Sequence, residues 1–214
     1  MCMIKKIFKE NWYYILAIVV LIVFFLLLKN SYYMVNIQRS DDLIREFVTK
    51  IGDKYLYPMI MITNIGYWYV PVMLILSLLL IYKDRIYFYL MSSMYAFSGI
   101  ISFVSKLIVL RERPDSSLIN MPSSYSFPSG HMLTSICFYF VFAYLLTLKL
   151  EKAEKVLFIS LFIILSLLIG LSRIYLGVHY FSDVFGGLLL SIPCILMFLN
   201  IVKKNFVEVE LWEV

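Results

Sequence analysis

Residues Val156–Ser172 read VLFISLFIILSLLIGLS, an unbroken run without a charged side chain. Five similar uncharged runs occur elsewhere in the chain: Asn11–Leu28, Tyr55–Tyr82, Ile86–Ser105, Met132–Leu148 and Val184–Val202. A helix of about 20 apolar residues crosses a hydrocarbon layer of about 30 Å and satisfies its backbone polar groups internally. The pattern therefore predicts an all-α, polytopic membrane protein, with six transmembrane helices in one bundle at about residues 12–28, 60–82, 86–108, 130–148, 156–174 and 182–202.

The composition supports this interpretation. Hydrophobic residues make up 62% of the chain and charged residues 15%, whereas about 25% of a soluble domain is charged. A soluble helical protein would carry charged residues along one face of each helix, and these runs have none. Because no linker or internal repeat divides the chain, we interpret residues 1–214 as a single domain.

The basic residues predict the orientation in the membrane. With the N-terminus inside, ten of the 19 Lys and Arg residues fall in inner segments and nine on the outer side. Most of the outer ones stand beside acids in the first outer loop or belong to the site described below, so the short inner loops agree with the positive-inside rule. Six spans then place both termini in the cytoplasm of a plasma membrane.

The first outer loop, about residues 29–54, predicts a short surface helix. Ser40 precedes two acids, Asp41 and Asp42, as a capping residue would. An apolar stripe at near-helical spacing follows, formed by Leu43, Phe47 and Ile51. The helix either lies on the membrane with this stripe in lipid or packs on the bundle.

Prolines predict irregular backbone in two places. Pro58 and Pro71 predict a bend in the second span, with Asn64 and Gly66 marking its outer end. Three more prolines, in a loop that also contains several serines, predict an irregular second outer loop over residues 111–128.

Polar residues able to do chemistry gather at the outer ends of the last four predicted spans. They are Lys106, Arg113, Ser129, Gly130, His131, Arg173, His179 and Asp183. The chain crosses the bilayer between them, yet the predicted topology returns each group, including both histidines of the protein, to the same face. Charged groups are costly inside lipid. The arrangement therefore predicts one site.

The cations of this set are suited to bind phosphate. Lys106, Arg113 and Arg173 have no matching acid cluster, and arginine offers a planar pair of donors to two oxygens. Ser129 and Gly130 stand at a predicted helix start, where free N–H groups favour an anion. Together these five residues predict an oxyanion-binding site.

The histidines complete a mechanism. His179 and Asp183 are spaced i, i+4, so in a helix they share one face and can form a hydrogen bond. The carboxylate would fix the tautomer and leave the other ring nitrogen to attack phosphorus. His131 would then protonate the leaving oxygen and later activate water.

These residues form three gapped motifs: Lys106-(six residues)-Arg113-Pro114, Pro128-Ser129-Gly130-His131, and Ser172-Arg173-(five residues)-His179-(three residues)-Asp183. In order and spacing the motifs resemble the signature of the type 2 phosphatidic acid phosphatase (PAP2) superfamily. The resemblance implies a bacterial membrane lipid phosphatase that needs no metal or other cofactor and has its site on the extracytoplasmic side. It implies a phosphohistidine on His179, with Asp183 as partner and His131 as acid. It also implies phosphate binding by Lys106, Arg113, Ser129, Gly130 and Arg173.

Several alternatives stay open at this point. Undecaprenyl diphosphate is the first expectation for the substrate, followed by phosphatidylglycerophosphate and phosphatidate, and a phosphotransferase that uses an alcohol in place of water would share the intermediate. A transporter would show polar residues through the depth of its spans, and three cations would repel a zinc ion. We expect lipid phosphate and membrane lipids as partners and no nucleic acid; the oligomeric state is open. Arg111, outside the motifs, is interpreted as interfacial.

Overall fold

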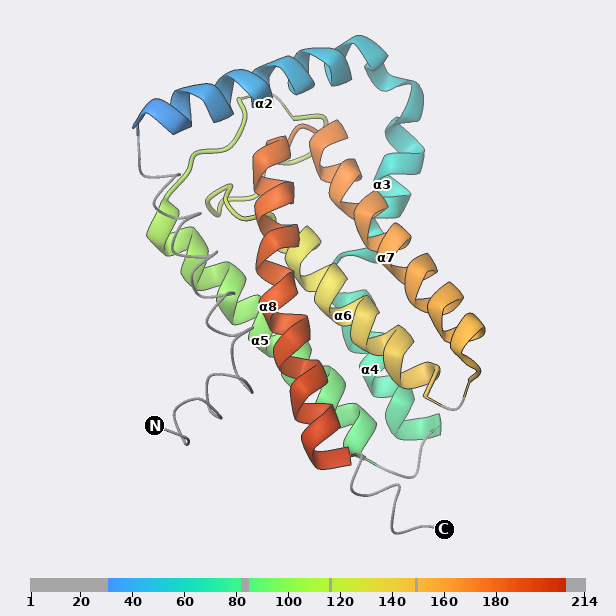
Figure 1. Cartoon of the computed structure of the whole chain (residues 1–214). Coiled ribbons are helices and arrows are strands. Elements are labelled where there is room, and N and C mark those ends of the chain that lie inside the picture. Colours follow the sequence, from blue (N-terminus) through green and yellow to red (C-terminus); the bar gives the residue numbers. More distant parts are fainter. Residues whose placement is uncertain (1–30, 82–84, 116, 149, 207–214) are drawn as a thin grey trace, which may run out of the picture.

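The computed structural model describes residues 31–81, 85–115, 117–148 and 150–206 (Figure 1). This part of the chain forms helices and loops, with no strand among the described residues. In chain order the elements are α2 (Ser31–Ile51), the 3₁₀ helix η1 (Gly52–Tyr55), α3 (Leu56–Ile65), α4 (Tyr69–Ile81), α5 (Ile86–Val109), α6 (Gly130–Leu146), α7 (Lys152–Tyr175) and α8 (Phe181–Phe206). The predicted first span, residues 12–28, lies outside the described residues.

The all-α membrane class is confirmed. Among the described helices, α5, α7 and α8 from Phe181 to Val202 are long and apolar enough to cross a membrane. A bent pair, Val35–Ile65 and Tyr69–Leu80, adds a fourth span if it is counted as one, and α6 is a shorter apolar helix of 17 residues. The positions of these helices agree with the predicted runs, while the total of six spans stays a prediction.

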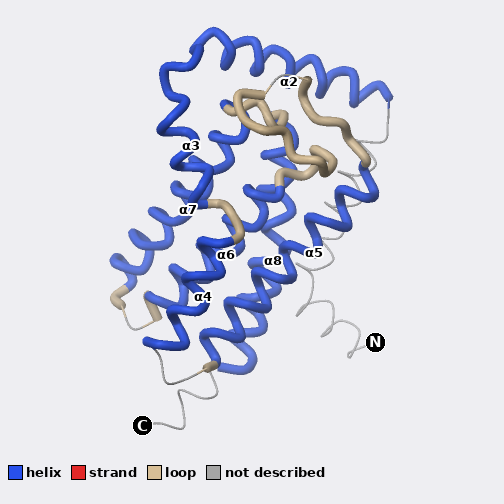
Figure 2. The backbone as a smooth tube through the Cα atoms, turned by 180° about the vertical axis from the view of Figure 1, so that it is seen from behind, coloured by secondary structure: helices blue, strands red, loops and turns tan. Residues whose placement is uncertain are grey.

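Helix α6 is the centre of the bundle. It packs against α5, α7 and α8, and Figures 1 and 2 show it lying among them. Most of its side chains are buried, including Leu133, Cys137, Phe138 and Val141. A helix that is apolar on every side is typically a buried one. The last predicted motif residue before this helix, Ser129, is therefore attached to the most enclosed element of the bundle.

The second predicted span is two helices. The chain direction changes by 44° at a break between Ile65 and Tyr69, so the prolines do not produce the bend where we expected it. Pro58 and Pro71 each lie in the first turn of a helix, where a missing N–H leaves no helical bond unmade. Gly66 lies inside the segment and not at its outer end. A Cβ atom there would stand 2.6 Å from Cγ2 of Ile169, so the break packs closely against α7.

Helix α2 differs from the predicted helix in its start, and it packs on the bundle with the face opposite the apolar stripe. It begins at Ser31, and Ser40 caps nothing, because its hydroxyl donates to the carbonyl of Asn36 within the helix. Figures 1 and 2 show α2 crossing one end of the bundle, where Ile44 and Val48 pack against core residues. The apolar stripe is exposed on the other side: Leu43 and Phe47 are 61% and 68% exposed.

The close approach of α8 to α6 generates a stability prediction. An alanine Cβ at Gly187 would lie 2.8 Å from the carbonyl oxygen of Ser129 and 3.2 Å from the amide nitrogen of Leu133, and backbone atoms cannot give way cheaply. At Gly99 in α5 a Cβ would meet nothing within 4 Å. Alanine in a helix is favoured over glycine by about 1 kcal/mol, so we expect Gly99→Ala to raise the Tm in detergent and Gly187→Ala to lower it by about 2–8 °C. Equal shifts in the two variants would contradict this packing.

Candidate active site

The turn between α7 and α8 brings two motif residues together. Helix α7 ends in a Schellman motif: the amide of Gly177 donates to the carbonyl of Ile174 and the amide of Val178 to the carbonyl of Arg173. Gly177 has a φ of +70°, which glycine adopts at no steric cost. The five residues between Arg173 and His179 therefore make up a single turn, which ends α7 and reverses the direction of the chain beside Arg173.

The carboxylate of Asp183 is the most heavily bonded group of the site. Its side chain is fully buried. Oδ2 accepts hydrogen bonds from the hydroxyl of Ser126 and the amide of Tyr180, and lies 3.3 Å from Nδ1 of His179. Oδ1 accepts a hydrogen bond from Nη1 of Arg111 at 2.8 Å. The predicted His179–Asp183 pair is present, and the contact leaves Nε2 of His179 on the opposite side of the ring.

Two of the motif cations lie beside this pair and bind backbone. Arg113 places Nη1 3.2 Å from Nε2 of His179 and 2.6 Å from the carbonyl of Val178. Lys106 donates to the carbonyls of Tyr125 and Ser126. Neither cation forms an ion pair within the described part of the chain. Their positive charges therefore stay without a carboxylate partner.

Arg173 is the most enclosed of the three motif cations, with 1% of its surface exposed. Its Nη1 donates to the hydroxyl of Thr63 in α3 at 2.9 Å, and its guanidinium interacts with Tyr67. Its charge acts on both Lys106 and Arg113. The break between α3 and α4 thus supplies the partners that hold this cation in the bundle.

Ser129, Gly130 and His131 form the start of α6. The amide of Ser129 donates to the backbone carbonyl of Asp183 at 3.0 Å, which ties this start to α8. The ring of His131 packs edge-on against Tyr67 with centroids 4.7 Å apart. The charges of Arg173, Arg113 and Lys106 act on this ring. All eight predicted site residues are thus gathered at one end of the bundle.

Within the described residues, four buried side-chain atoms have no hydrogen-bond partner. They are Ser129 Oγ, His131 Nε2, Ser135 Oγ and Arg173 Nε. Three of the four belong to predicted site residues. Buried polar atoms without partners are rare and call for a reason, such as a ligand that would complete them.

Arg111 was misread from the sequence. It is 8% exposed and lies between two carboxylates, those of Asp183 and Asp41, the latter at 2.7 Å from Nη2. Sequence reasoning also missed Ser126 as a donor to Asp183. No spacing rule connects Asp41 to Arg111, seventy residues later; the one available signal was a second arginine two positions before a motif arginine.

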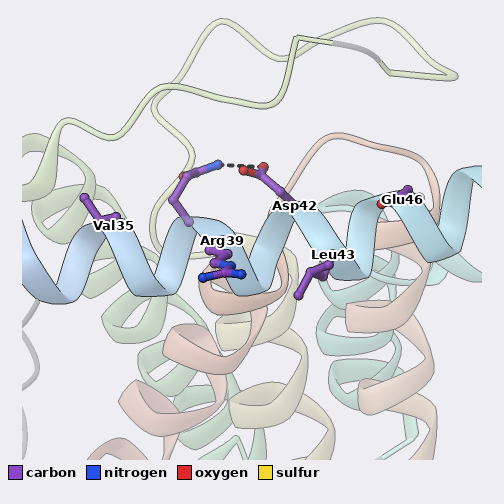
Figure 3. A pocket seen from close by; sticks show the side chains of 6 residues that line it. Val35, Arg39, Asp42, Leu43 and Glu46 are labelled. Carbon is purple, nitrogen blue, oxygen red and sulfur yellow. Dashed lines mark hydrogen bonds between the residues drawn. The ribbon is translucent and has the colours of Figure 1, made fainter.

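Two surface cavities are relevant to the site. A pocket of about 450 Å³ runs along α2 and contains no predicted site residue; Val35, Gln38, Arg39, Asp42, Leu43 and Glu46 line it (Figure 3). A second, of about 220 Å³, includes Arg113 together with Glu112 and residues 121–125 of the loop between α5 and α6. Of these two cavities, the smaller one includes a motif residue, Arg113, so we place the opening of the site there.

The surroundings keep His179 neutral and Arg113 charged at pH 7. Burial lowers the pKa of His179 to about 4; the hydrogen bond and charge of Asp183 oppose this change, while the charges of Arg113 and Arg173 add to it. Burial, with a smaller contribution from the charge of Arg173, lowers the pKa of Arg113 to about 10. A neutral imidazole retains the lone pair that a nucleophile needs.

Comparison with known proteins identifies the family. The model of the PAP2 superfamily matches residues 87–206. The chain belongs to the PAP2 superfamily. Phosphatidylglycerophosphatase B of Bacillus subtilis (strain 168) is 33% identical over 174 residues, which cover 76% of this chain and 82% of that protein. This PAP2 chain is thus a membrane enzyme of the lipid phosphatase class, as the motifs predicted.

Two solved structures share the fold. The crystal structure of a transmembrane PAP2-type phosphatidylglycerolphosphate phosphatase from Bacillus subtilis has a TM-score of 0.78 and 30% identity, and the match covers 87% of this chain and 96% of that one. LpxE of Aquifex aeolicus has a TM-score of 0.56 and 21% identity, with 73% and 93% covered. The second match supports the fold alone.

The low pKa of His179 can be measured directly. The protein has two histidines, so a His131→Gln variant labelled with ¹⁵N-histidine gives the signal of His179 alone. We expect this imidazole to stay neutral as the pH falls through 6 and 5 and to take up its proton near pH 4. Arg113→Met, which removes a repelling charge, should raise the pKa, whereas Arg39→Met on exposed α2 should not. A midpoint near 6.5 would contradict the burial of this ring.

Proposed function

We propose that this chain is a phosphatidylglycerophosphate phosphatase of the plasma membrane, acting at the extracytoplasmic face through a phosphohistidine on His179. The observation that carries the proposal is the buried His179–Asp183 pair beside three cations that have no carboxylate partner among the described residues. The substrate assignment is supported by the relative from Bacillus subtilis, whose name states that activity. Both termini in the cytoplasm follow from the charge pattern of the loops.

The first step forms the phosphohistidine. Nδ1–H of His179 donates to Oδ2 of Asp183, 3.3 Å away, which directs the lone pair of Nε2 toward the substrate. Nε2 attacks phosphorus, the N–P bond forms, and the bond to the leaving oxygen breaks. His131 donates a proton to that oxygen, so the product leaves as an alcohol.

The second step releases phosphate. His131, now without the proton, removes one from a water molecule, whose oxygen attacks phosphorus while the N–P bond breaks. The lone pair returns to Nε2 of His179, and inorganic phosphate leaves. An alcohol in place of water would give a phosphotransferase by the same step.

The cations would bind the phosphate in both steps. Nζ of Lys106 and the guanidinium of Arg113 now donate to carbonyls of residues 124–126, so a phosphate must replace these carbonyl oxygens. The unpaired atoms of Ser129 and Arg173 supply further donors, and the first N–H groups of α6 lie at Gly130. Charge that develops on the phosphoryl oxygens is stabilised by these groups.

Undecaprenyl diphosphate, our first expectation from the sequence, stays a prediction. Neither Bacillus subtilis relative is named for it. We therefore place phosphatidylglycerophosphate first and use undecaprenyl diphosphate and phosphatidate as comparison substrates.

The experiment measures phosphate release by the purified protein in detergent with EDTA, using the three lipids at matched surface concentrations. We expect metal-free turnover with the highest kcat/KM for phosphatidylglycerophosphate. His179→Ala should lose more than about 10⁴-fold in kcat, and an acid-labile phosphoprotein should form in the wild type and be missing in this variant. Arg39→Ala on exposed α2 is the control.

Different outcomes contradict different parts of the proposal. Turnover that survives in His179→Ala would remove the histidine mechanism. A higher kcat/KM on undecaprenyl diphosphate would restore the first expectation, and phosphate transfer to added glycerol in preference to water would identify a phosphotransferase.

A further inference from the structure

A buried network of charges connects α2 to the reacting pair. Arg111 directs Nη1 to Oδ1 of Asp183 at 2.8 Å and to the hydroxyl of Ser182 at 2.6 Å. Its Nη2 binds Oδ2 of Asp41 at 2.7 Å and Oε1 of Gln38 at 3.1 Å. Arg111, Asp41 and Asp183 are each less than a tenth exposed.

Further contacts hold the guanidinium of Arg111 in place. Its carbon lies 4.2 Å above the ring of Tyr180. Asp41 also accepts hydrogen bonds from the amide and hydroxyl of Ser182, the residue next to Asp183. A planar guanidinium can bind two carboxylates at once in only one orientation. The positions of Asp41 and Asp183 therefore depend on each other through Arg111.

Arg111 binds the carboxylate oxygen of Asp183 that does not contact His179. Oδ2 of Asp183 faces His179, and Oδ1 is held by Arg111. Ser126 and the amide of Tyr180 hold Oδ2, so with Oδ1 free the carboxylate would keep these bonds but could turn further about its Cβ–Cγ bond and change its direction toward His179. A displacement of about 1 Å in a reacting group costs about 100-fold in rate.

We propose that Arg111, held in place by Asp41 of α2, is a positioning residue that fixes the orientation of Asp183 and through it the tautomer and direction of His179. Neither residue touches the phosphate; both act through Asp183. The assignment of a rate effect to this network rests on the proposed function, while the tautomer effect does not. Asp41 lies outside the motifs that carry the family resemblance, and Arg111 is one of the six unspecified residues between Lys106 and Arg113.

The kinetic test uses Arg111→Met, Asp41→Asn and the double variant, with Glu46→Gln on α2 as the control, since Glu46 pairs only with exposed Lys50. The measurement is the rate constant of the pre-steady-state burst of phosphohistidine formation, with substrate in excess over enzyme. We expect losses of about 100-fold for Arg111→Met and about 10-fold for Asp41→Asn. In the Arg111→Met background Asp41→Asn should cost much less than it does alone, because its main effect passes through that arginine and the remainder through Ser182.

The rate constant distinguishes a positioning role of Arg111 and Asp41 from an effect on the amount of folded enzyme. A merely structural role would reduce the amplitude of the burst, which counts folded enzyme, and leave its rate constant unchanged. That result, or fully additive losses in the double variant, would overturn the proposal.

The second measurement is independent of the reaction. In the His131→Gln background the ¹⁵N shifts of His179 report its tautomer. We expect one Nδ1–H tautomer with Arg111 present, and a mixture in Arg111→Met. An unchanged single tautomer in Arg111→Met would overturn the proposal. If the wild type forms no phosphohistidine but the tautomer responds, the proposed function fails and the positioning role stands.

Discussion

The site depends on the burial of one carboxylate, that of Asp183. An ionised carboxylate removed from water is costly unless its oxygens are paired and hydrogen-bonded. Asp183 meets this requirement with donors from two places: the loop after α5, which supplies Arg111 and Ser126, and the turn before α8, which supplies Tyr180. Its backbone carbonyl binds the amide of Ser129 as well. Satisfying this residue therefore brings the starts of α6 and α8 and the long loop to one point.

The pairing of Asp183 with Arg111 also determines the charge left in the site. Coulomb attraction is strong where water is excluded. An unpaired Asp183 would therefore form an ion pair with Lys106, Arg113 or Arg173 and neutralise the charge of that cation. Because Arg111 already serves Asp183, the three motif cations form no ion pair among the described residues, and their partners there are neutral carbonyl, hydroxyl and imidazole groups. A group of one buried and two half-buried cations with neutral partners favours an anion, as phosphate chemistry requires.

The sequence predicts the parts of this protein that follow local rules. Uncharged runs located α5, α6, α7 and α8 within a few residues, because an apolar run in lipid can only be a helix. The motif residues were found because fixed spacings become fixed geometry, as in the helix-ending turn at Gly177. The break at Gly66 and the true start of α2 were not found. Both depend on tertiary contacts, a packed glycine and a helix lying across the bundle, and leave no periodic signal.

The misreading of Arg111 has a physical origin. Single arginines near span ends usually extend to the interface, and only the fold places Asp41 within reach. On α2, Asp41 and Leu43 are two residues apart and so point to nearly opposite sides of the helix. One side carries the buried acid, and the other carries exposed apolar side chains. A shift of α2 would therefore move Asp41 relative to Ser182 and Arg111, so the placement of this surface helix and the geometry of His179 are not independent of each other.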